Sequence, residues 1–219
     1  MKIQYITHAC FKISSDEGRG VNILIDPIAA KMGKIPHQKD IDILLTSHSH
    51  PDHYGLDNDI DKTYFHIETP GEYDLKDVFI EGISTYHDKV KGAERGLNTV
   101  YTIFLEGIFL CHLGDLGDKL SVKEIEKIGQ VDVLFVPVGG KYTIDSKEAL
   151  DVIDQLEPGI VIPMHYGNKD LGIDGLDDVD KFLSLSGKTH ETVKTLKLTR
   201  DMIPEDREQY LIYLLEKSI

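Results

Sequence analysis

The sequence predicts a layered protein of the α/β or α+β class, in which sheets pack face to face and helices cover their outer faces. In the first half of the chain, short runs rich in Ile, Leu, Tyr and Phe are separated by Gly, Asp-Pro and charged turns, as successive strands would be. In the second half, apolar strand-like runs alternate with amphipathic helical segments. Neither a repeat nor a linker divides the chain, so we expect a single domain over residues 1–219.

The expected elements can be assigned in order along the chain. The strands of the first half are KIQYI, CFKIS, NILID, DILLTS, TYFHIE, DVFIEGIST, TVYTIFLEG and IFLCHLG, with a hairpin turn at Glu106 and Gly107. Helices are expected over residues 121–129, 145–158 and 175–187, and Ser121 and Glu124 form a capping box at the start of the first. Strands are expected over residues 131–138, 159–165 and 193–198, whereas the stretch 209–216 fits either a strand or a terminal helix.

Composition narrows the range of functions. The net charge of −14 argues against nucleic acid as a partner, because non-specific binding needs a basic surface. No apolar run approaches the length of a membrane span and the N-terminus lacks the features of a signal peptide, so we expect a cytoplasmic protein with no membrane partner. Cys10 and Cys111 lie in strand-like runs, where a reduced core thiol is expected.

The segment HSHPDH, which follows a predicted strand, is typical of a metal site. Residues i and i+2 of an extended segment point to the same side, so His48 and His50 can present two imidazoles to one ion. Pro51 then breaks the strand geometry, and the turn lets Asp52 and His53 face a second ion. Imidazole and carboxylate groups without a thiolate cluster suit Zn²⁺, Mn²⁺, Fe or Ni²⁺.

Four further residues follow predicted strands and are expected to converge on the same sheet edge: Asp26, His87, Asp115 and His165. The carboxylate of Asp115 could bridge two cations. His87 and His165 would complete one coordination sphere each and leave positions open for water.

These motifs, in this order, resemble those of the metallo-β-lactamase superfamily over the whole chain. HSHPDH matches its His-x-His-x-Asp-His signature, and Asp26, His87, Asp115 in HLGDLG and His165 in PMHY match the other four motifs. The segments ITHACFKI, RGLNTVYTI and PVGGKYTID resemble a compact branch that includes L-ascorbate-6-phosphate lactonases and Zn-dependent hydrolases. The resemblance implies an α+β fold, the four-layer αβ/βα sandwich, with the metals at one edge between the sheets.

The resemblance also implies a role for each residue. His48, His50 and His87 would hold one divalent ion; Asp52, His53 and His165 would hold a second; and Asp115 would bridge them. Zinc is the first expectation, with Mn, Fe and Ni as alternatives. Asp26 would accept hydrogen bonds that fix the loop carrying the histidines.

Several residues are left with two interpretations. His112 could replace His87 as a ligand, and His8 could be a structural histidine or a pocket residue. Arg95, Asn98 and Tyr142 could orient a substrate, although a turn or surface role is as simple. His37, His66 and His190 are expected at the surface or in packing, and the acidic run 57–62 is expected to be a solvated turn, not a calcium loop.

The function predicted from these features is hydrolysis of a small ester, lactone or phosphate ester by hydroxide at a dinuclear site, with Asp52 also orienting the nucleophile. The partner would be a small-molecule substrate, and homo-oligomerisation is left open. The alternatives are a di-iron or other metal-dependent oxidoreductase, and a metal-bound sensing protein. A nuclease is disfavoured by the net charge of −14.

Overall fold

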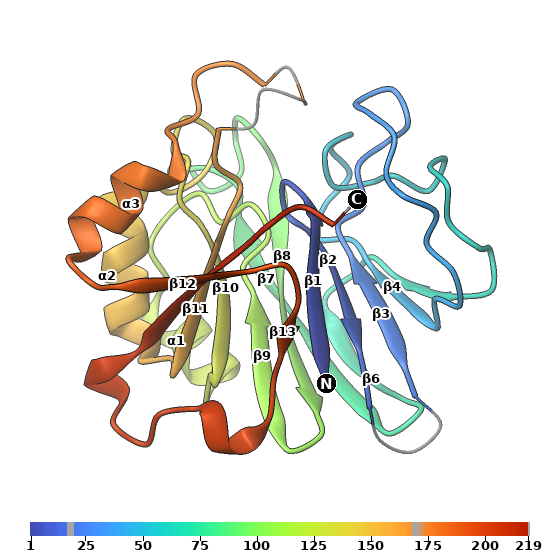
Figure 1. Cartoon of the computed structure of the whole chain (residues 1–219). Helices are drawn as coiled ribbons and strands as arrows, with labels where there is room; N and C mark the ends of the chain where they lie inside the picture. Colours follow the sequence, from blue (N-terminus) through green and yellow to red (C-terminus); the bar gives the residue numbers. More distant parts are fainter. Residues whose placement is uncertain (17–19, 168–170, 172, 219) are drawn as a thin grey trace.

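The computed structural model describes residues 1–16, 20–167, 171 and 173–218, which form two β-sheets packed face to face (Figure 1). The six-stranded sheet has the order β13-β1-β2-β3-β4-β5. Its strands are β1 (Lys2–Thr7), β2 (Cys10–Ser14), β3 (Asn22–Ile25), β4 (Ile43–Leu45), β5 (Phe65–Ile67) and β13 (Leu196–Lys197). Both ends of the chain contribute to this sheet, because Lys2 pairs with Lys197.

The second sheet has eight strands in the order β12-β14-β11-β10-β9-β8-β7-β6. These are β6 (Gly71–Leu75), β7 (Val78–Tyr86), β8 (Leu97–Leu105), β9 (Ile108–His112), β10 (Val133–Pro137), β11 (Ile160–Met164), β12 (His190–Val193) and β14 (Leu211–Leu215). Strands β9, β10, β11 and β14 run parallel to one another, whereas β6 to β9 form an antiparallel meander. The stretch 209–216 therefore contains a strand.

The three predicted helices are present, each shorter than its predicted range. They are α1 (Val122–Ile128), α2 (Ser146–Leu156) and α3 (Val179–Ser186), and short 3₁₀ turns occupy η2 (Arg200–Met202) and η3 (Arg207–Gln209). Ser121 and Glu124 form the expected capping box of α1. The hairpin turn between β8 and β9 also lies at Glu106 and Gly107, both with positive φ.

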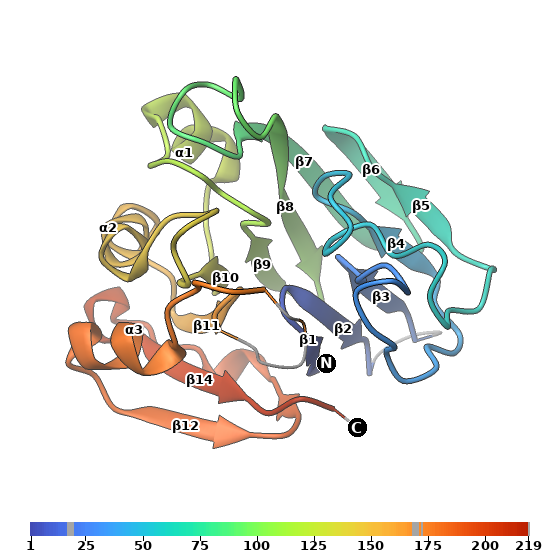
Figure 2. The ribbon, with the colours of Figure 1, turned by 90° about the horizontal axis from the view of Figure 1, so that it is seen from above.

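Side chains that alternate between the two faces of each strand form the hydrophobic core. In β10, Val133 and Phe135 point into the space between the sheets, and Leu134 and Val136 point to the opposite face. That opposite face is covered by α1, α2 and α3 (Figure 2). Cys10 and Cys111 are free and fully buried, which confirms that they are core thiols.

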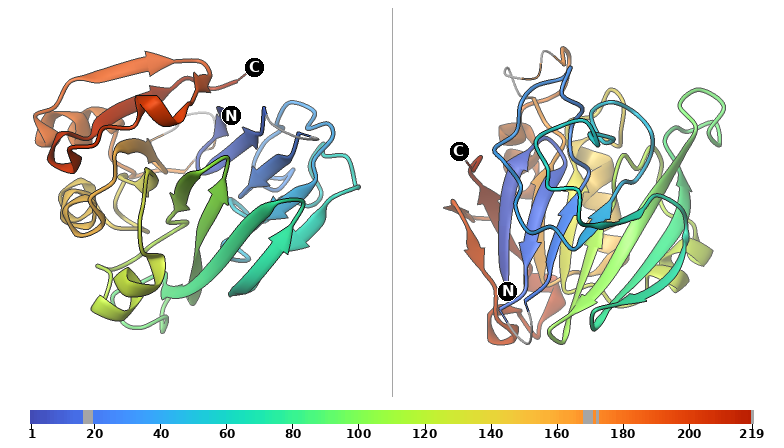
Figure 3. Two further views of the ribbon diagram at one scale, coloured as in Figure 1. Left: turned by 90° about the horizontal axis from the view of Figure 1, so that it is seen from below. Right: turned by 90° about the vertical axis from the view of Figure 1, so that its right-hand side faces the viewer.

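The predicted α+β sandwich of two sheets packed face to face is confirmed, with one difference in its outermost layer. Within the described residues no helix covers the outer face of the six-stranded sheet; loops between β3 and β6 lie there instead (Figure 3, right). Ile28, Ile35 and Ile60 from these loops pack on Leu24 and Leu44 of the sheet. Pro27, Gly33 and Pro36 interrupt the first of these loops, so Ile28 and Ile35 are buried there without a helix.

The segment 193–198, predicted as one strand, is divided between the two sheets. Val193 ends β12 of the eight-stranded sheet, and β13 joins the six-stranded sheet. The segment thus crosses from one sheet to the other. Nowhere in the described chain is there a helix long and apolar enough to cross a membrane.

A buried carboxylate holds the lower end of the eight-stranded sheet together. Asp132 is fully buried and accepts hydrogen bonds from the Phe109 backbone N–H (2.9 Å), from Arg207 Nη2 (2.7 Å) and from Arg200 Nη1. Burial opposes ionisation, but these hydrogen bonds and the two guanidinium groups outweigh it and hold the pKa of Asp132 below its usual range.

We expect Asp132→Asn to lower the free energy of unfolding by about 3 kcal/mol, because it leaves two guanidinium groups without their counter-ion. Since the pKa of Asp132 is lower in the folded than in the unfolded protein, this stabilisation is present above pH 3.8 and is lost as the pH falls further. Urea denaturation at pH 7 and pH 3 measures both effects. Asp74→Asn, at an exposed position of β6, is the control and should change little.

Candidate metal centre

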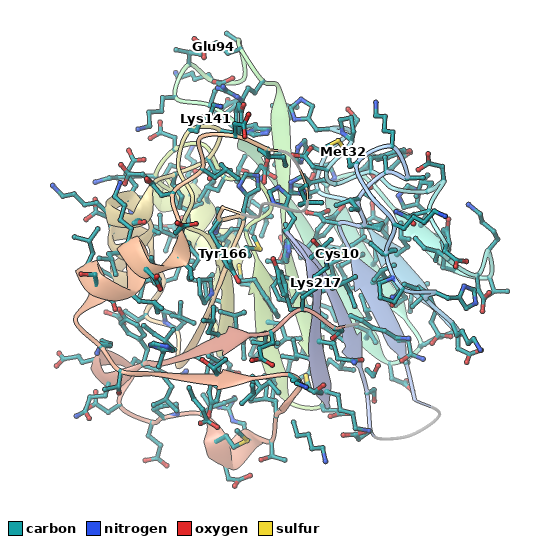
Figure 4. All side chains as sticks on the ribbon, turned by 45° about the horizontal axis from the view of Figure 1, so that its top comes forward. Cys10, Met32, Glu94, Lys141, Tyr166 and Lys217 are labelled. Atoms are coloured by element: carbon teal, nitrogen blue, oxygen red, sulfur yellow. The ribbon has the colours of Figure 1, made fainter. Side chains whose placement is uncertain are left out.

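Loops that follow several strands of both sheets meet at one edge of the sandwich, the upper edge in Figure 1. His8 follows β1, Asp26 follows β3 and His165 follows β11. Figure 4, in which this edge is turned toward the viewer, shows Met32, Glu94 and Lys141 on loops that emerge there. The sheets therefore deliver residues distant in sequence to one place, as the strand-end pattern predicts.

Asp115 lies at the centre of the predicted residues and is fully buried. Its Oδ1 is 2.9 Å from His53 Nε2. Its Oδ2 is 3.1 Å from His87 Nε2, 3.2 Å from His165 Nε2 and 3.8 Å from His48 Nε2. One carboxylate thus contacts imidazoles from three separate loops.

The potential ligand atoms form groups in which all members lie within 4.8 Å of one another. The groups are His48, His50 and His87; His8, Asp52, His53 and His165; and His48, His53 and Asp115. All seven residues predicted as ligands are therefore brought together. The first two groups separate His48, His50 and His87 from Asp52, His53 and His165, and the third group joins them through Asp115. His8 is the additional member, for which the sequence left a structural role equally open.

The chemistry of these side chains fits divalent cations. Oxygen and nitrogen donors of this kind suit Zn²⁺ and other first-row metals. His53 Nε2, Asp115 Oδ1 and both ring nitrogens of His165 are buried and have no hydrogen-bond partner among the described residues. Buried polar atoms normally have hydrogen-bond partners. Nitrogen and oxygen atoms that lack them and lie around a common point are free to bind a cation there.

The protonation states agree with this. Burial, reinforced by the neighbouring His53, lowers the pKa of His48 to about 3, so its imidazole is neutral at pH 7 and can donate a lone pair. Burial also opposes ionisation of Asp115, but His165 and His53 outweigh it and hold the pKa of this carboxyl well below its usual range. Burial would lower the pKa of His53, but Asp115 and Asp26 outweigh it and hold this pKa well above its usual range. Without an ion, the centre therefore combines a neutral imidazole at His48, an imidazolium at His53 and an ionised carboxylate at Asp115, and a bound cation would take the place of the His53 proton.

Asp26 fixes the loop that carries the histidines, as predicted. Its Oδ1 accepts the Ser47 backbone N–H (2.6 Å), and its Oδ2 accepts the Ser47 hydroxyl (2.7 Å) and His53 Nδ1 (2.8 Å). A proton on His53 Nδ1 leaves Nε2 free to face the centre. Asp26 is fully buried and adopts φ +46°, so the backbone is held in the left-handed region at this point.

The position of Asp115 depends on two residues whose roles the sequence did not reveal. Asn98 Oδ1 accepts the Asp115 backbone N–H (2.8 Å), and Asn98 Nδ2 donates to Leu113 O (2.9 Å). Gly114 has φ +55°, and a Cβ there would lie 2.3 Å from Asn98 Oδ1. Asn98 therefore acts on the backbone next to Asp115, and only the glycine allows the two segments to approach so closely.

His112 is placed differently from the other histidines of this edge. Its Nε2 donates to Ala9 O (3.0 Å), and its Nδ1 accepts the Gly114 backbone N–H (3.2 Å). Both ring nitrogens of His112 are thus hydrogen-bonded to backbone groups. His87, and not His112, belongs to the group of potential ligands with His48 and His50. His37 and His190 are exposed, as expected.

A groove of about 430 Å³ lies beside the more exposed half of the centre. It is lined by Ser47, His48, Ser49, His50, Glu68, Pro70, Ser84, Arg95, Gly96, Leu97 and Thr99. Among these residues Arg95 alone carries a guanidinium group. The Cζ atom of Arg95 lies 5.1 Å from the centre of the Tyr142 ring. The lining of the groove is more apolar than polar and carries one cation, Arg95, and one carboxylate, Glu68, so it suits a small molecule with polar groups on an apolar frame.

The loop that presents Arg95 has a fixed shape. Asp88 Oδ1 accepts the backbone N–H groups of Val90 (2.9 Å) and Gly92 (2.7 Å). Asp88 Oδ2 accepts those of Glu94 (2.9 Å) and Arg95 (2.8 Å). One carboxylate therefore organises the whole loop from its inner side and holds its conformation next to the groove.

Comparisons with known proteins agree with the fold and the centre. A profile of the "Beta-lactamase superfamily domain" matches residues 2–165. The UPF0173 protein PYRAB01190 of Pyrococcus abyssi is 35% identical over 187 residues, which cover 76% of this chain and 84% of that protein. A UPF0173 metal-dependent hydrolase of Carboxydothermus hydrogenoformans is 30% identical over 196 residues, with the same shares covered.

A solved structure is also similar over nearly the full length. It is a Thermotoga maritima protein provisionally assigned as a Zn-dependent hydrolase of the metallo-β-lactamase superfamily, with 36% identity and a TM-score of 0.77. The match covers 98% of this chain and 99% of that one. The chain belongs to the metallo-β-lactamase superfamily and is a metal-dependent hydrolase.

We expect Asp26→Asn to lower the affinity for divalent ions by about 10- to 100-fold, the usual effect of losing a group that orients a ligand. An amide cannot accept hydrogen bonds with both of its ends, so the proton on His53 Nδ1 would lose its acceptor. Competition with a chromogenic chelator measures the affinity. Asp180→Asn, on the exposed side of α3, is the control, and an unchanged affinity of Asp26→Asn would contradict the assigned role.

Proposed function

We propose that the protein hydrolyses a small ester, lactone or phosphate ester at a centre of two divalent ions. The observation that carries this proposal is the position of Asp115, whose carboxylate lies between two groups of ligand atoms. Two groups that share a carboxylate suit a pair of ions better than a single one. The arrangement of all these residues within one fold supports a single catalytic domain.

In this proposal His48, His50 and His87 hold the first ion. Asp52, His53 and His165 hold the second, and Asp115 bridges the two. The donor set supports zinc, with manganese, iron and nickel as the alternatives that an elemental analysis would distinguish.

When bound, two divalent ions supply hydroxide near neutral pH and polarise the oxygen of a carbonyl or phosphoryl group. The chain's own residues orient the reactants. The Asp52 side chain is 20% exposed, whereas His53 and His165 are buried, so its carboxylate reaches the solvent side and can orient the proton of the nucleophile. His48 and His50 line the groove, where the substrate would lie.

A small molecule is the proposed substrate. The net charge of −14 opposes the approach of nucleic acid, and the groove's volume of about 430 Å³ suits a metabolite-sized compound. Serine, threonine, glutamate and arginine side chains along the groove offer hydrogen bonds to a polar substrate. A sugar lactone or phosphate ester would use such groups.

The test of this function begins with metal analysis of the purified protein and a panel of chromogenic esters, lactones, phosphodiesters and thioesters. We expect zinc in a ratio of two ions per chain and hydrolysis of at least one class. Asp52→Asn and His50→Ala should lower kcat by about 10²- to 10⁴-fold while the fold is retained. His190→Ala, at an exposed site on β12, is the matched control.

Wild-type rates for Asp52→Asn and His50→Ala at full metal loading would exclude the mechanism. Iron with oxygen-dependent turnover would instead favour an oxidoreductase. Bound metal without any turnover would favour a sensing protein.

We also expect Arg95→Gln to raise KM about tenfold or more for anionic substrates, because a charge-assisted hydrogen bond contributes about 1.5–3 kcal/mol. The change in kcat and in metal content should be small, since Arg95 belongs to none of the ligand groups. Lys91→Gln, an exposed lysine of the same loop that does not line the groove, is the control. Equal KM values for Arg95→Gln and the wild type would remove Arg95 from substrate binding.

A further inference from the structure

His8 is a buried histidine whose ring is left without hydrogen bonds. It follows β1 in the turn that leads to β2, and its exposed fraction is 0%. Neither Nδ1 nor Nε2 has a hydrogen-bond partner in the part of the chain that the structure describes. A satisfied structural histidine, which was one of the two readings of the sequence, would have at least one partner, as His112 does.

The imidazole of His8 lies against one half of the metal centre. Its Nε2 is 3.6 Å from Asp52 Oδ2, which is too long for a hydrogen bond but usual for two ligands of one ion. The ring centre of His8 is 3.9 Å from that of His165 and 5.5 Å from that of His53. Donor atoms of these four residues all lie within 4.8 Å of one another.

The backbone holds His8 in this place. The His165 backbone N–H donates to His8 O (3.1 Å), so the turn after β1 and the end of β11 are joined next to the two imidazoles. His8 has φ +56° and His165 has φ +52°, both in the left-handed region. Such a conformation costs about 1–2 kcal/mol in a residue other than glycine, and it is kept where the structure uses it.

We propose that His8 is a ligand of the second ion, through Nε2, together with Asp52, His53 and His165. This inference rests on the proposed dinuclear function and adds to it a difference between the two ion positions. The second position has four side chains besides the shared Asp115, and the first position has three. The second ion is therefore bound more tightly, and its removal requires a stronger chelator.

The first test is a metal titration of the metal-free His8→Asn variant, followed by chelator competition. Asparagine tolerates the left-handed backbone but cannot carry an imidazole nitrogen to the second ion. In the wild type we expect two ions of unequal affinity, and in the variant the tighter of the two should bind at least tenfold more weakly. Bound Co²⁺ should also change its visible absorption, because the spectrum depends on the number of ligands.

The stability of the metal-free protein separates a ligand from a structural residue. Because the His8 ring makes no hydrogen bond in the described structure and the backbone bond through His8 O is kept in the variant, metal-free His8→Asn should unfold at the same urea concentration as the wild type or a higher one. His112→Gln is the matched control: it changes an equally buried histidine that is fully hydrogen-bonded. In the metal-free form it should unfold at a lower urea concentration than the wild type.

A second measurement needs no variant. In protein labelled with ¹⁵N-histidine and loaded with ¹¹³Cd²⁺, each coordinated imidazole nitrogen is coupled to cadmium. The proposal predicts such coupling for His8 in addition to His48, His50, His53, His87 and His165. Wild-type affinities in His8→Asn, or the lack of coupling at His8 when the other histidines show it, would overturn the inference and leave the dinuclear function intact. A wild type that binds no divalent ion would overturn the dinuclear function itself.

Discussion

The burial of the Asp115 carboxylate is the constraint on which the rest of this edge depends. An ionised group is very costly to remove from water unless opposite charges or strong donors surround it. Asp115 is met by imidazoles from the loops after β4, β7 and β11, and Asp26 is buried a short distance away against His53. The imidazolium of His53 cannot by itself balance the two buried carboxylates of Asp26 and Asp115. Divalent cations can, so the same arrangement that makes the metal-free centre unfavourable makes the metal-bound centre stable.

The two sheets supply the rigidity that this arrangement needs. Strand ends bring the ligands to one edge, but the final approach is made by loops that touch one another closely. Gly114 and Gly117 flank Asp115; a Cβ at Gly117 would lie 2.2 Å from the Asp88 backbone nitrogen, just as one at Gly114 would meet Asn98. At Asp26, the backbone accepts a left-handed conformation so that the side chain points inward. His8, Asp26 and His165 share this left-handed conformation, so part of the backbone strain in the described chain lies where ligands are positioned, and the well-packed sheets compensate for it.

The sequence predicts what depends on local pattern. HSHPDH shows the metal centre, the capping box shows where α1 begins, and strand alternation shows the core. What it misses depends on how distant segments meet. The residues around His8 in the sequence do not indicate whether its side chain binds a metal or only packs. The role proposed for it depends on the β1–β2 turn lying beside the end of β11. In the same way, the loops over the six-stranded sheet bury apolar residues such as Ile28 in stretches that prolines and glycines interrupt, so no strand or helix marks these residues as core.

One half of the centre is buried and the other half faces the groove. The residues that would retain a metal ion are therefore different from those that would select a substrate. His8, His53 and His165 are sealed from solvent, so in the proposed centre the second ion would be held by residues that a substrate does not need to move. His48 and His50 face the groove, and the wall beyond them is built by the loop that Asp88 organises and that carries Arg95. Changes in that loop can alter which molecule is accepted without disturbing the buried ligands, because the two regions share only the first ion position. Such a division allows one metal centre to serve different hydrolytic reactions by variation of a single loop.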